Sequence, residues 1–338
     1  EAFRPYASAD PAGVEVGVYD EVEPDPKVET AEKARDRVQD AEADLIIGLG
    51  GGSSLDIAKV ASILLTNPGS PLDYAGIGLV PEPGIPTILI PTTAGTGSEV
   101  TPIAVLSDER KHLKKGVVSE HLYADVALVD PELTRSVPPR VTAYTGIDAL
   151  THCIEAYTNR RANPFVDNFA REGIRLIGES IRKAVADGED REAREAMAMG
   201  SLYGGLCLGS VNTAAVHALA YPLGGTFNVP HGLANSLLLP YVMRHNLIGN
   251  LEKYAEIAVL LGEPVEGLSL REAAERSVAA VEQLSDDVSL PRGMRKLDIP
   301  EDAIPEMAEA AMKVTRLMVN NPRVLTVDDC ETIYRAAY

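Results

Sequence analysis

The chain has 338 residues, 45% of them hydrophobic, and its formal net charge at pH 7 is −19. This length and composition predict a soluble protein of two packed domains, and the acidic balance excludes nucleic acid and anionic membranes as partners. No apolar run approaches the ~18 residues of a membrane span, and the three cysteines form no CxxC pair. Since the first residues also lack the pattern of an export signal, we expect a cytoplasmic location.

The first part of the chain alternates short apolar runs with helical patterns. We expect a strand at 14–20 (VEVGVYD), a helix at 28–43, a strand leading into a helix at 45–66, and strands at 87–93 and 126–133. This alternation predicts a parallel sheet covered by helices on both faces. A nucleotide-binding sheet of this kind normally has one more strand and helix at its start, and only a remnant precedes residue 14.

The second part of the chain shows only helical periodicity. Long amphipathic patterns run from 163 to 188 and, without interruption, from 189 to 223. The two patterns of the chain meet near SVPPR (136–140), where two prolines interrupt both. We therefore predict an α/β domain at 1–138 and an all-helical domain at 139–338.

A glycine-rich loop follows the strand in LIIGLGGGSSLDIAK. Glycines 50–52 and Ser53 lie directly before a predicted helix, so that backbone N–H groups and the helix N-terminus can bind an anion such as a pyrophosphate. The loop matches neither GxGxxG nor the P-loop pattern. A glycine-rich turn that binds nothing is the alternative.

A second polar loop follows the strand in TILIPTTAGTGSEVT. It carries four hydroxyls (Thr92, Thr93, Thr96 and Ser98) and two glycines. In a doubly wound sheet both loops lie at the carboxyl ends of strands, where ligands bind. Capping of the next helix, the competing explanation, requires only one hydroxyl.

Asp148 and His152 lie four residues apart in the helical pattern TGIDALTHCIEAY. This spacing places both side chains on one helix face, where they can share an ion. Taken alone, the pair is more typical of a helical ion pair or hydrogen bond.

Two further histidines bound the segment HALAYPLGGTFNVPH. We expect His217 late in an apolar helix and His231 at the start of the next helix, with a turn between Pro222 and Pro230. Both environments favour neutral imidazole, the form that ligates metals. With Asp148 and His152 they would supply three nitrogens and one oxygen, a set suited to Fe²⁺ or Zn²⁺. A hydrogen-bonded core histidine and a helix cap are the alternatives.

Four motifs in this order, GGGSSLDIAK, PTTAGTGSEVT, GIDALTHCIEAY and HALAYPLGGTFNVPHGLAN, resemble those of the iron-containing (group III) alcohol dehydrogenases. The similarity runs from about Val14 to the C-terminus. The resemblance implies an N-terminal dinucleotide-binding domain, a helical domain, and a cofactor and metal that face each other between them. It also implies hydride transfer between NAD or NADP and a small alcohol or carbonyl substrate whose oxygen the ion polarises, in an enzyme that forms homo-oligomers.

The resemblance also assigns roles to individual residues. It implies metal ligation by Asp148, His152, His217 and His231. It implies cofactor binding by Asp25, Gly51, Gly52, Ser53, Thr92, Thr96, Val105 and Lys114.

Three departures from the family pattern bear on this assignment. Asp25 stands in Pro-Asp-Pro where the family has Pro-Asn-Pro, and the strand that helps select NAD over NADP is not in this chain. Tyr221 occupies the position of a histidine proposed to relay protons. With an ordinary pKa of about 10, tyrosine is a poor proton acceptor near neutrality, so Tyr221 is a candidate relay only.

Two other functions remain open from sequence. One is an enzyme like glycerol dehydrogenase or dehydroquinate synthase, although 143–245 lacks the clustered lysines that a phosphorylated substrate requires. The other is a non-catalytic nucleotide-binding relative.

Overall fold

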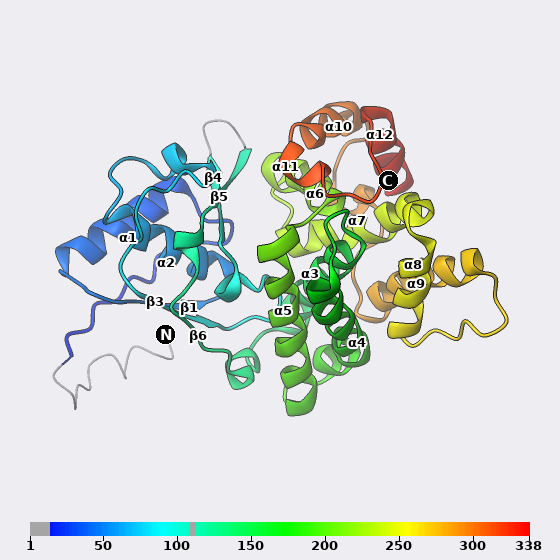
Figure 1. Ribbon diagram of the computed structural model, residues 1–338, viewed down its shortest axis with the longest axis horizontal. Coiled ribbons are helices and arrows are strands. Elements are labelled where there is room, and N and C mark those ends of the chain that lie inside the picture. The colour runs from blue at the N-terminus through cyan, green and yellow to red at the C-terminus, as the bar shows by residue number, and fades with distance from the viewer. Residues whose placement is uncertain (1–13, 109–112) are drawn as a thin grey trace.

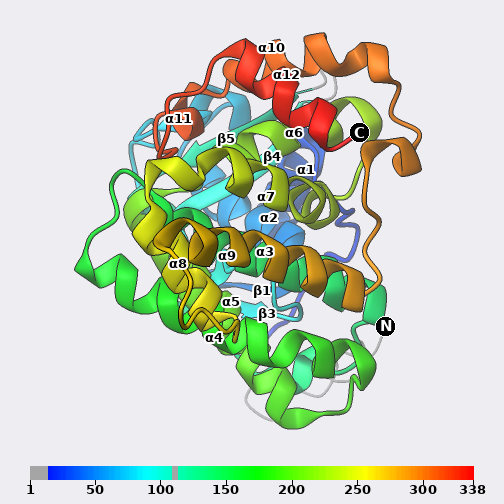
Figure 2. The ribbon, with the colours of Figure 1, turned by 90° about the vertical axis from the view of Figure 1, so that its right-hand side faces the viewer.

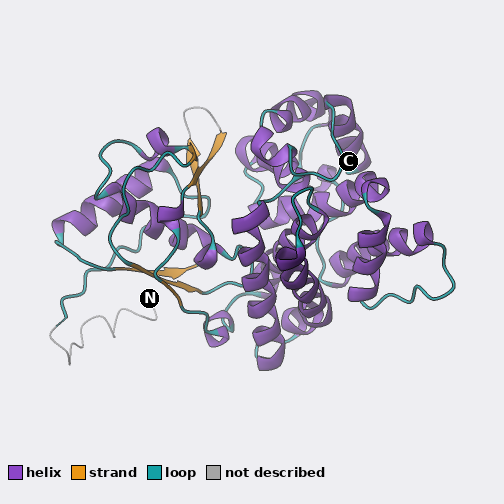
Figure 3. Ribbon diagram, in the orientation of Figure 1, coloured by secondary structure: helices purple, strands orange, loops and turns teal. Residues whose placement is uncertain are grey.

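The computed structural model describes residues 14–108 and 113–338, and it separates an α/β part from a helical part (Figures 1 and 3). This confirms the predicted fold class. The elements of the α/β part are α1 (Val28–Asp40), β1 (Ile46–Gly50), α2 (Gly52–Leu64), β2 (Gly76–Ile77), β3 (Thr87–Pro91), β4 (Ile103–Asp108), β5 (Leu113–Val118) and β6 (Val126–Ala127).

Among its described residues the helical part contains helices joined by loops and short 3₁₀ turns, and no strand. The helices are α3 (Pro139–Thr158), α4 (Pro164–Ala186), α5 (Arg191–Val211), α6 (Ala215–Phe227), α7 (His231–Asn246), α8 (Leu251–Leu260), α9 (Leu270–Asp287), α10 (Ile304–Met312), α11 (Thr315–Met318) and α12 (Val327–Ala336). The domain boundary at 138/139 stays a prediction.

The strands form two small sheets. One has the order β1-β3-β6 with all strands parallel, and the other has the order β2-β5-β4, in which β4 and β5 are antiparallel. Helix α2 packs on one face of the parallel sheet, while Ile47 and Val126 are 57% and 45% exposed. The expectation of helices on both faces is therefore wrong for the described residues, because the β4–β5 hairpin and short turns replace a helix between β3 and β6.

The strand expected at 14–20 is not present. Residues 14–20 have no regular structure, and Val14, Val16 and Val18 are about half exposed. The alternating valines fit a strand, but none of the described strands pairs with them. The strand expected at 126–133 is also short, since β6 ends at Ala127 and a 3₁₀ turn occupies Pro131–Thr134.

The long pattern from 189 to 223 forms two helices, not one. Asn212 has a φ of 61° and a ψ of 175°, an extended conformation through which a helix cannot continue, and the chain bends by 103° between α5 and α6. Among the described residues no single helix is long and apolar enough to cross a membrane; the bent pair α5 and α6 meets the same test of length and composition.

The bend corrects two expectations about the histidine segment. His217 lies in the first turn of α6, not late in a helix, and α6 continues through Pro222 to Phe227. Proline removes one helical hydrogen bond, but Leu219 and Leu223 beside it are fully buried, and this packing keeps the helix intact. The turn is confined to 228–230, and α7 begins at His231 as predicted.

The largest hydrophobic core lies inside the helical part, whose helices surround α3 (Figure 2). Residues 143 and 146–158 of α3 are buried, including Asp148 and His152. Such a rigid central helix holds polar side chains in fixed positions, as a metal site requires.

Candidate functional site

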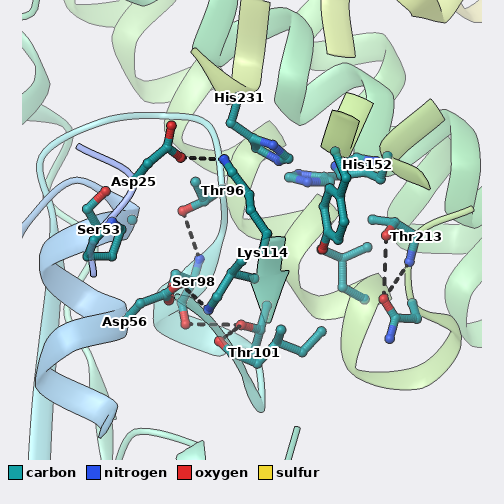
Figure 4. A pocket seen from close by; sticks show the side chains of 18 of the residues that line it. Asp25, Ser53, Asp56, Thr96, Ser98, Thr101, Lys114, His152, Thr213 and His231 are labelled. Atoms are coloured by element: carbon teal, nitrogen blue, oxygen red, sulfur yellow. Dashed lines mark hydrogen bonds and ion pairs between the residues drawn. The ribbon is translucent and has the colours of Figure 1, made fainter. Parts of the chain in front are cut away.

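A pocket lies between the α/β part and the helical part (Figure 4). Ser53 and Thr96 line it from the α/β side, and His152 and His231 line it from the helical side. Of the predicted cofactor residues, six line this pocket: Asp25, Gly52, Ser53, Thr96, Val105 and Lys114. Gly51 and Thr92 belong to the same two loops but not to the lining.

The two polar loops touch at the start of α2. A Cβ atom added to Gly52 would lie 2.6 Å from Cγ2 of Thr96, so only glycine permits this approach. Gly51 is the N-cap residue of α2, and the Thr92 N–H donates to the Gly50 carbonyl at 2.9 Å. The loops therefore present backbone N–H groups and hydroxyls beside a helix N-terminus, which suits an anionic cofactor group.

A buried lysine fixes the second loop on α2. Lys59 is 1% exposed and donates to the carbonyl oxygens of Ser98 at 2.9 Å and Ile103 at 2.5 Å. Its neighbour Asp56 accepts from Ser98 Oγ at 2.6 Å and from the Val105 N–H at 2.9 Å. These two residues were not predicted as part of the site, although a lysine inside the apolar run IAKVASILL is a signal for a buried polar network.

Asp25 and Lys114 pair with each other, with 2.5 Å between Lys114 Nζ and Asp25 Oδ1 (Figure 4). Asp25 has a φ of 54°, a conformation in which aspartate is less strained than most residues. The pair joins the segment before α1 to β5 at the rim of the pocket.

Three of the four predicted metal ligands converge. One ligand atom each from Asp148, His217 and His231 lies within 4.8 Å of the other two. His152 lies beside this group: its ring stacks on that of His217 with 4.8 Å between centroids, and its Nε2 is 3.9 Å from Asp148 Oδ1. The structure thus brings together a three-residue cluster with His152 adjacent to it.

Glu155, one turn after His152 on α3, orients His217. Its carboxylate accepts the N–H groups of Ala214 and Val216 at the start of α6, and it lies 2.6 Å from His217 Nδ1. With Nδ1 facing Glu155, the other ring nitrogen of His217, Nε2, points away from that carboxylate and is buried without a hydrogen-bond partner. A buried imidazole nitrogen of this kind fits a metal ion.

Asn235 connects the other two ligands. Its amide nitrogen donates to Asp148 Oδ1 at 2.7 Å and lies 3.1 Å from His231 Nε2. The sequence analysis missed both Glu155 and Asn235. Their spacing from His152 and His231 on the helices was a weak signal at most, because their partners lie 62 and 87 residues away in the chain.

The electrostatics favour the ligating forms of these side chains. Burial lowers the pKa of His152, and burial with the nearby Lys114 charge lowers the pKa of His231 to about 3. Burial alone would raise the pKa of Asp148, but the neighbouring histidines and the Asn235 amide hold it below its ordinary value. Neutral imidazoles and one carboxylate are the donors that Fe²⁺ and Zn²⁺ take.

The lowered histidine pKa values predict acid sensitivity of the metal-free protein. As pH falls through 6.5, His152 and His231 gain protons in the unfolded chain before they do so in the folded protein, so the folded state loses stability toward pH 3. We expect His231 to account for a loss of about 1 kcal/mol between pH 6.5 and 5.5, and His152 to add to that loss; both are measurable by urea unfolding in a chelator. An unchanged free energy of unfolding across this interval would contradict the prediction.

The position of Glu155 predicts a metal-binding phenotype. Glu155→Gln removes the negative charge beside His217 and replaces one of the two acceptor oxygens by an NH2 donor, and we expect metal affinity to fall about 10- to 100-fold, measured by competition with a chelator. Glu256→Gln is the matched control, since Glu256 pairs with Arg171 outside the pocket. Equal metal affinity of the two variants would rule out this role.

Comparison with known proteins agrees with this geometry. Residues 4–131 match the family model described as iron-containing alcohol dehydrogenase, and residues 142–338 match its C-terminal counterpart, the Fe-containing alcohol dehydrogenase family. The chain is 47% identical over 329 residues to long-chain-alcohol dehydrogenase 1 of Geobacillus thermodenitrificans, covering 96% of this chain and 83% of that relative. It is 42% identical to 1,3-propanediol dehydrogenase of Klebsiella pneumoniae over 97% of this chain and 84% of the relative.

Solved structures show the same similarity. A crystal structure of 1,3-propanediol oxidoreductase superposes with a TM-score of 0.94 at 42% identity, over 97% of this chain and 85% of that one. An archaeal halo-thermophilic alcohol dehydrogenase from a Red Sea brine pool superposes with a TM-score of 0.89 at 32% identity, over 97% and 85% of the two chains. The family models and these relatives together show that the chain belongs to the iron-containing alcohol dehydrogenase family.

Proposed function

We propose that this protein is a metal-dependent oxidoreductase that transfers a hydride between a nicotinamide cofactor and a small alcohol or carbonyl substrate. The observation that carries the proposal is the cluster of Asp148, His217 and His231, whose two histidines line the same pocket as the two cofactor loops. When bound, the ion supplies a Lewis acid and the nicotinamide supplies or accepts the hydride.

The chain's own residues hold and orient these groups. Gly51, Gly52 and Ser53 suit the pyrophosphate of NAD or NADP, and Thr92 and Thr96 suit the cofactor through the second loop. Val105 and Lys114 suit the nicotinamide and its ribose, and Asp25 suits the adenosine ribose. Asp148, His152, His217 and His231 would hold the ion, for which we propose Fe²⁺, with Zn²⁺ as the alternative that the usual affinity order allows. Burial of Asp148, His152 and His217 at 5% exposure or less keeps bulk water from these ligands.

Three finer points belong to the proposal. The free cysteines Cys153, Cys207 and Cys330 are buried, which fits a cytoplasmic protein. The family resemblance supports a homo-oligomer. We also propose that residues 1–138 and 139–338 form the two domains on either side of the pocket.

An activity assay tests the proposal. Protein reconstituted anaerobically with Fe²⁺ or Zn²⁺ should oxidise NADH or NADPH with propanal, and the chelated protein should not. Full activity after chelation would exclude the Lewis-acid mechanism. Tight cofactor binding with no turnover of any alcohol or aldehyde would favour a non-catalytic relative, while the matches to alcohol dehydrogenases leave little support for a dehydroquinate synthase-like reaction.

Tyr221 is the proposed proton relay. Its ring lies 6.5 Å from that of His231, and its hydroxyl oxygen accepts a hydrogen bond from Arg316 Nη2 at 2.8 Å, which leaves its own O–H free to donate. We expect Tyr221→Phe to lower kcat for propanol oxidation about 10- to 100-fold and to alter its pH profile. An unchanged kcat and pH profile would exclude the relay.

A further inference from the structure

Arg316 is a cation at the metal side of the pocket whose charge has no partner. It lines the pocket and is half-buried, and its Nη2 donates to the hydroxyl of Tyr221 at 2.8 Å. Within the described part of the chain no carboxylate lies within ion-pair distance of its guanidinium.

The other charged side chains around the pocket each have a polar or charged partner. Lys114 pairs with Asp25 at 2.5 Å, and Asp56 lies 3.4 Å from the buried Lys59. Asp148 is 2% exposed and faces the histidines. Among the described residues that line the pocket, Arg316 is therefore the charged side chain that can still pair with an anionic ligand.

The structure fixes the position of Arg316. Asn320, which is 1% exposed, donates to the Arg316 carbonyl at 3.1 Å and to the Thr213 carbonyl at 2.8 Å, so α11 is tied to the bend between α5 and α6. On the other side, a Cβ atom added to Gly116 of β5 would lie 2.9 Å from Arg316 Nη2. The guanidinium therefore spans from the helical part to β5, close to the metal cluster.

The hydrogen-bond donors of Arg316, beside Tyr221 in the pocket, suit a carboxylate. One N–H group of Arg316 donates to the hydroxyl oxygen of Tyr221, and the remaining guanidinium N–H groups are free donors. A guanidinium fork binds a carboxylate with two parallel hydrogen bonds, and these charge-assisted bonds are about twice as strong as neutral ones. A neutral alkyl chain at the same place would leave these donors unpaired.

We propose that the substrate is a short aldehyde or alcohol that carries a carboxylate, with its reacting oxygen toward the Asp148 and histidine cluster and its carboxylate on Arg316. This inference rests on the proposed oxidoreductase function and narrows its substrate class. Arg316 is then the residue that determines specificity for the charged end of the substrate.

The test compares matched aldehydes with the metal-reconstituted protein. Glyoxylate is set against acetaldehyde, and succinic semialdehyde against butanal, with kcat/KM as the readout. We expect the wild-type protein to favour the carboxylate at one of these lengths by about tenfold or more. Arg316→Gln should lower that ratio about 10- to 100-fold, and Arg316→Lys, which keeps the charge but not the fork, should lower it less.

Two further variants control for instability of Arg316→Gln and for a general effect of removing an arginine. Gly116→Ala keeps the arginine but pushes on its Nη2, so it should also lower the ratio, even if Arg316→Gln proves unstable. Arg276→Gln removes an exposed arginine of α9 and should leave the ratio unchanged.

The outcomes separate the inference from the proposed function. Turnover of neutral aldehydes with no preference for carboxylates at either length, or a ratio unaffected by Arg316→Gln, would overturn the inference alone. A different result would be a rise in the Kd of Arg316→Gln for NADH, measured by fluorescence, without a change in the ratio of kcat/KM values. That result would assign the guanidinium to a cofactor phosphate and would also overturn the inference. No turnover of any of the four aldehydes would remove the proposed function and the inference with it.

Discussion

Replacing His231 by alanine should abolish metal binding and lower kcat/KM for propanal reduction by about a thousandfold or more. His231 is one of three residues whose ligand atoms lie within 4.8 Å of one another, and an ion at such a site stabilises developing charge by several kcal/mol, each 1.4 kcal/mol being a factor of ten in rate. Elemental analysis of anaerobically reconstituted protein measures the metal, and NADH oxidation measures the rate.

The same helix provides the control for this variant. His245 lies 14 residues later on α7, near Asp329 and outside the pocket. His245→Asn should keep the metal content and the rate. If His231→Ala bound metal in the same ratio as His245→Asn, the cluster would not be the metal site.

The sequence predicts those parts of the site whose residues lie close together in the chain. Asp148 and His152 share a helix face because they are four residues apart. The glycines at the start of α2 indicate that another loop packs closely against them. His231 was recognisable as a neutral imidazole from its apolar surroundings, and His217 as a buried histidine. Their convergence with Asp148, however, depends on how α3, α6 and α7 pack, which no local pattern contains.

The wrong predictions have one physical origin: they take no account of contacts between residues that are far apart in the chain. The valines at 14–20 alternate as in a strand, but a strand requires a neighbour to pair with, and the described sheet offers none. The pattern from 189 to 223 is helical throughout, yet Glu155 on α3 accepts the first N–H groups of α6 and so stabilises a new helix start there. Arg316 was missed because α11 reaches the pocket only through the fold.

Lys59 should prove as important for stability as the ligands are for chemistry. Its ammonium group donates to the carbonyl oxygens of Ser98 and Ile103 and lies 3.4 Å from Asp56. Burial lowers the pKa of this lysine, so the protein tolerates it only because these acceptors compensate for the lost water. Lys59→Met keeps the aliphatic stem but leaves the carbonyls and the Asp56 carboxylate without their partner.

We therefore expect Lys59→Met to lower the free energy of unfolding by about 3–5 kcal/mol, measured by urea titration. Since residues 98–103 would lose the Lys59 hydrogen bonds and would be held on α2 by Asp56 alone, the Kd for NADH should rise as well. Lys33→Met is the matched control: Lys33 is exposed on α1, and its replacement should change stability by about 0.5 kcal/mol or less. If the two variants were equally stable, the Lys59 network would be dispensable, and the cofactor loop would owe its position to the contact between Gly52 and Thr96 instead.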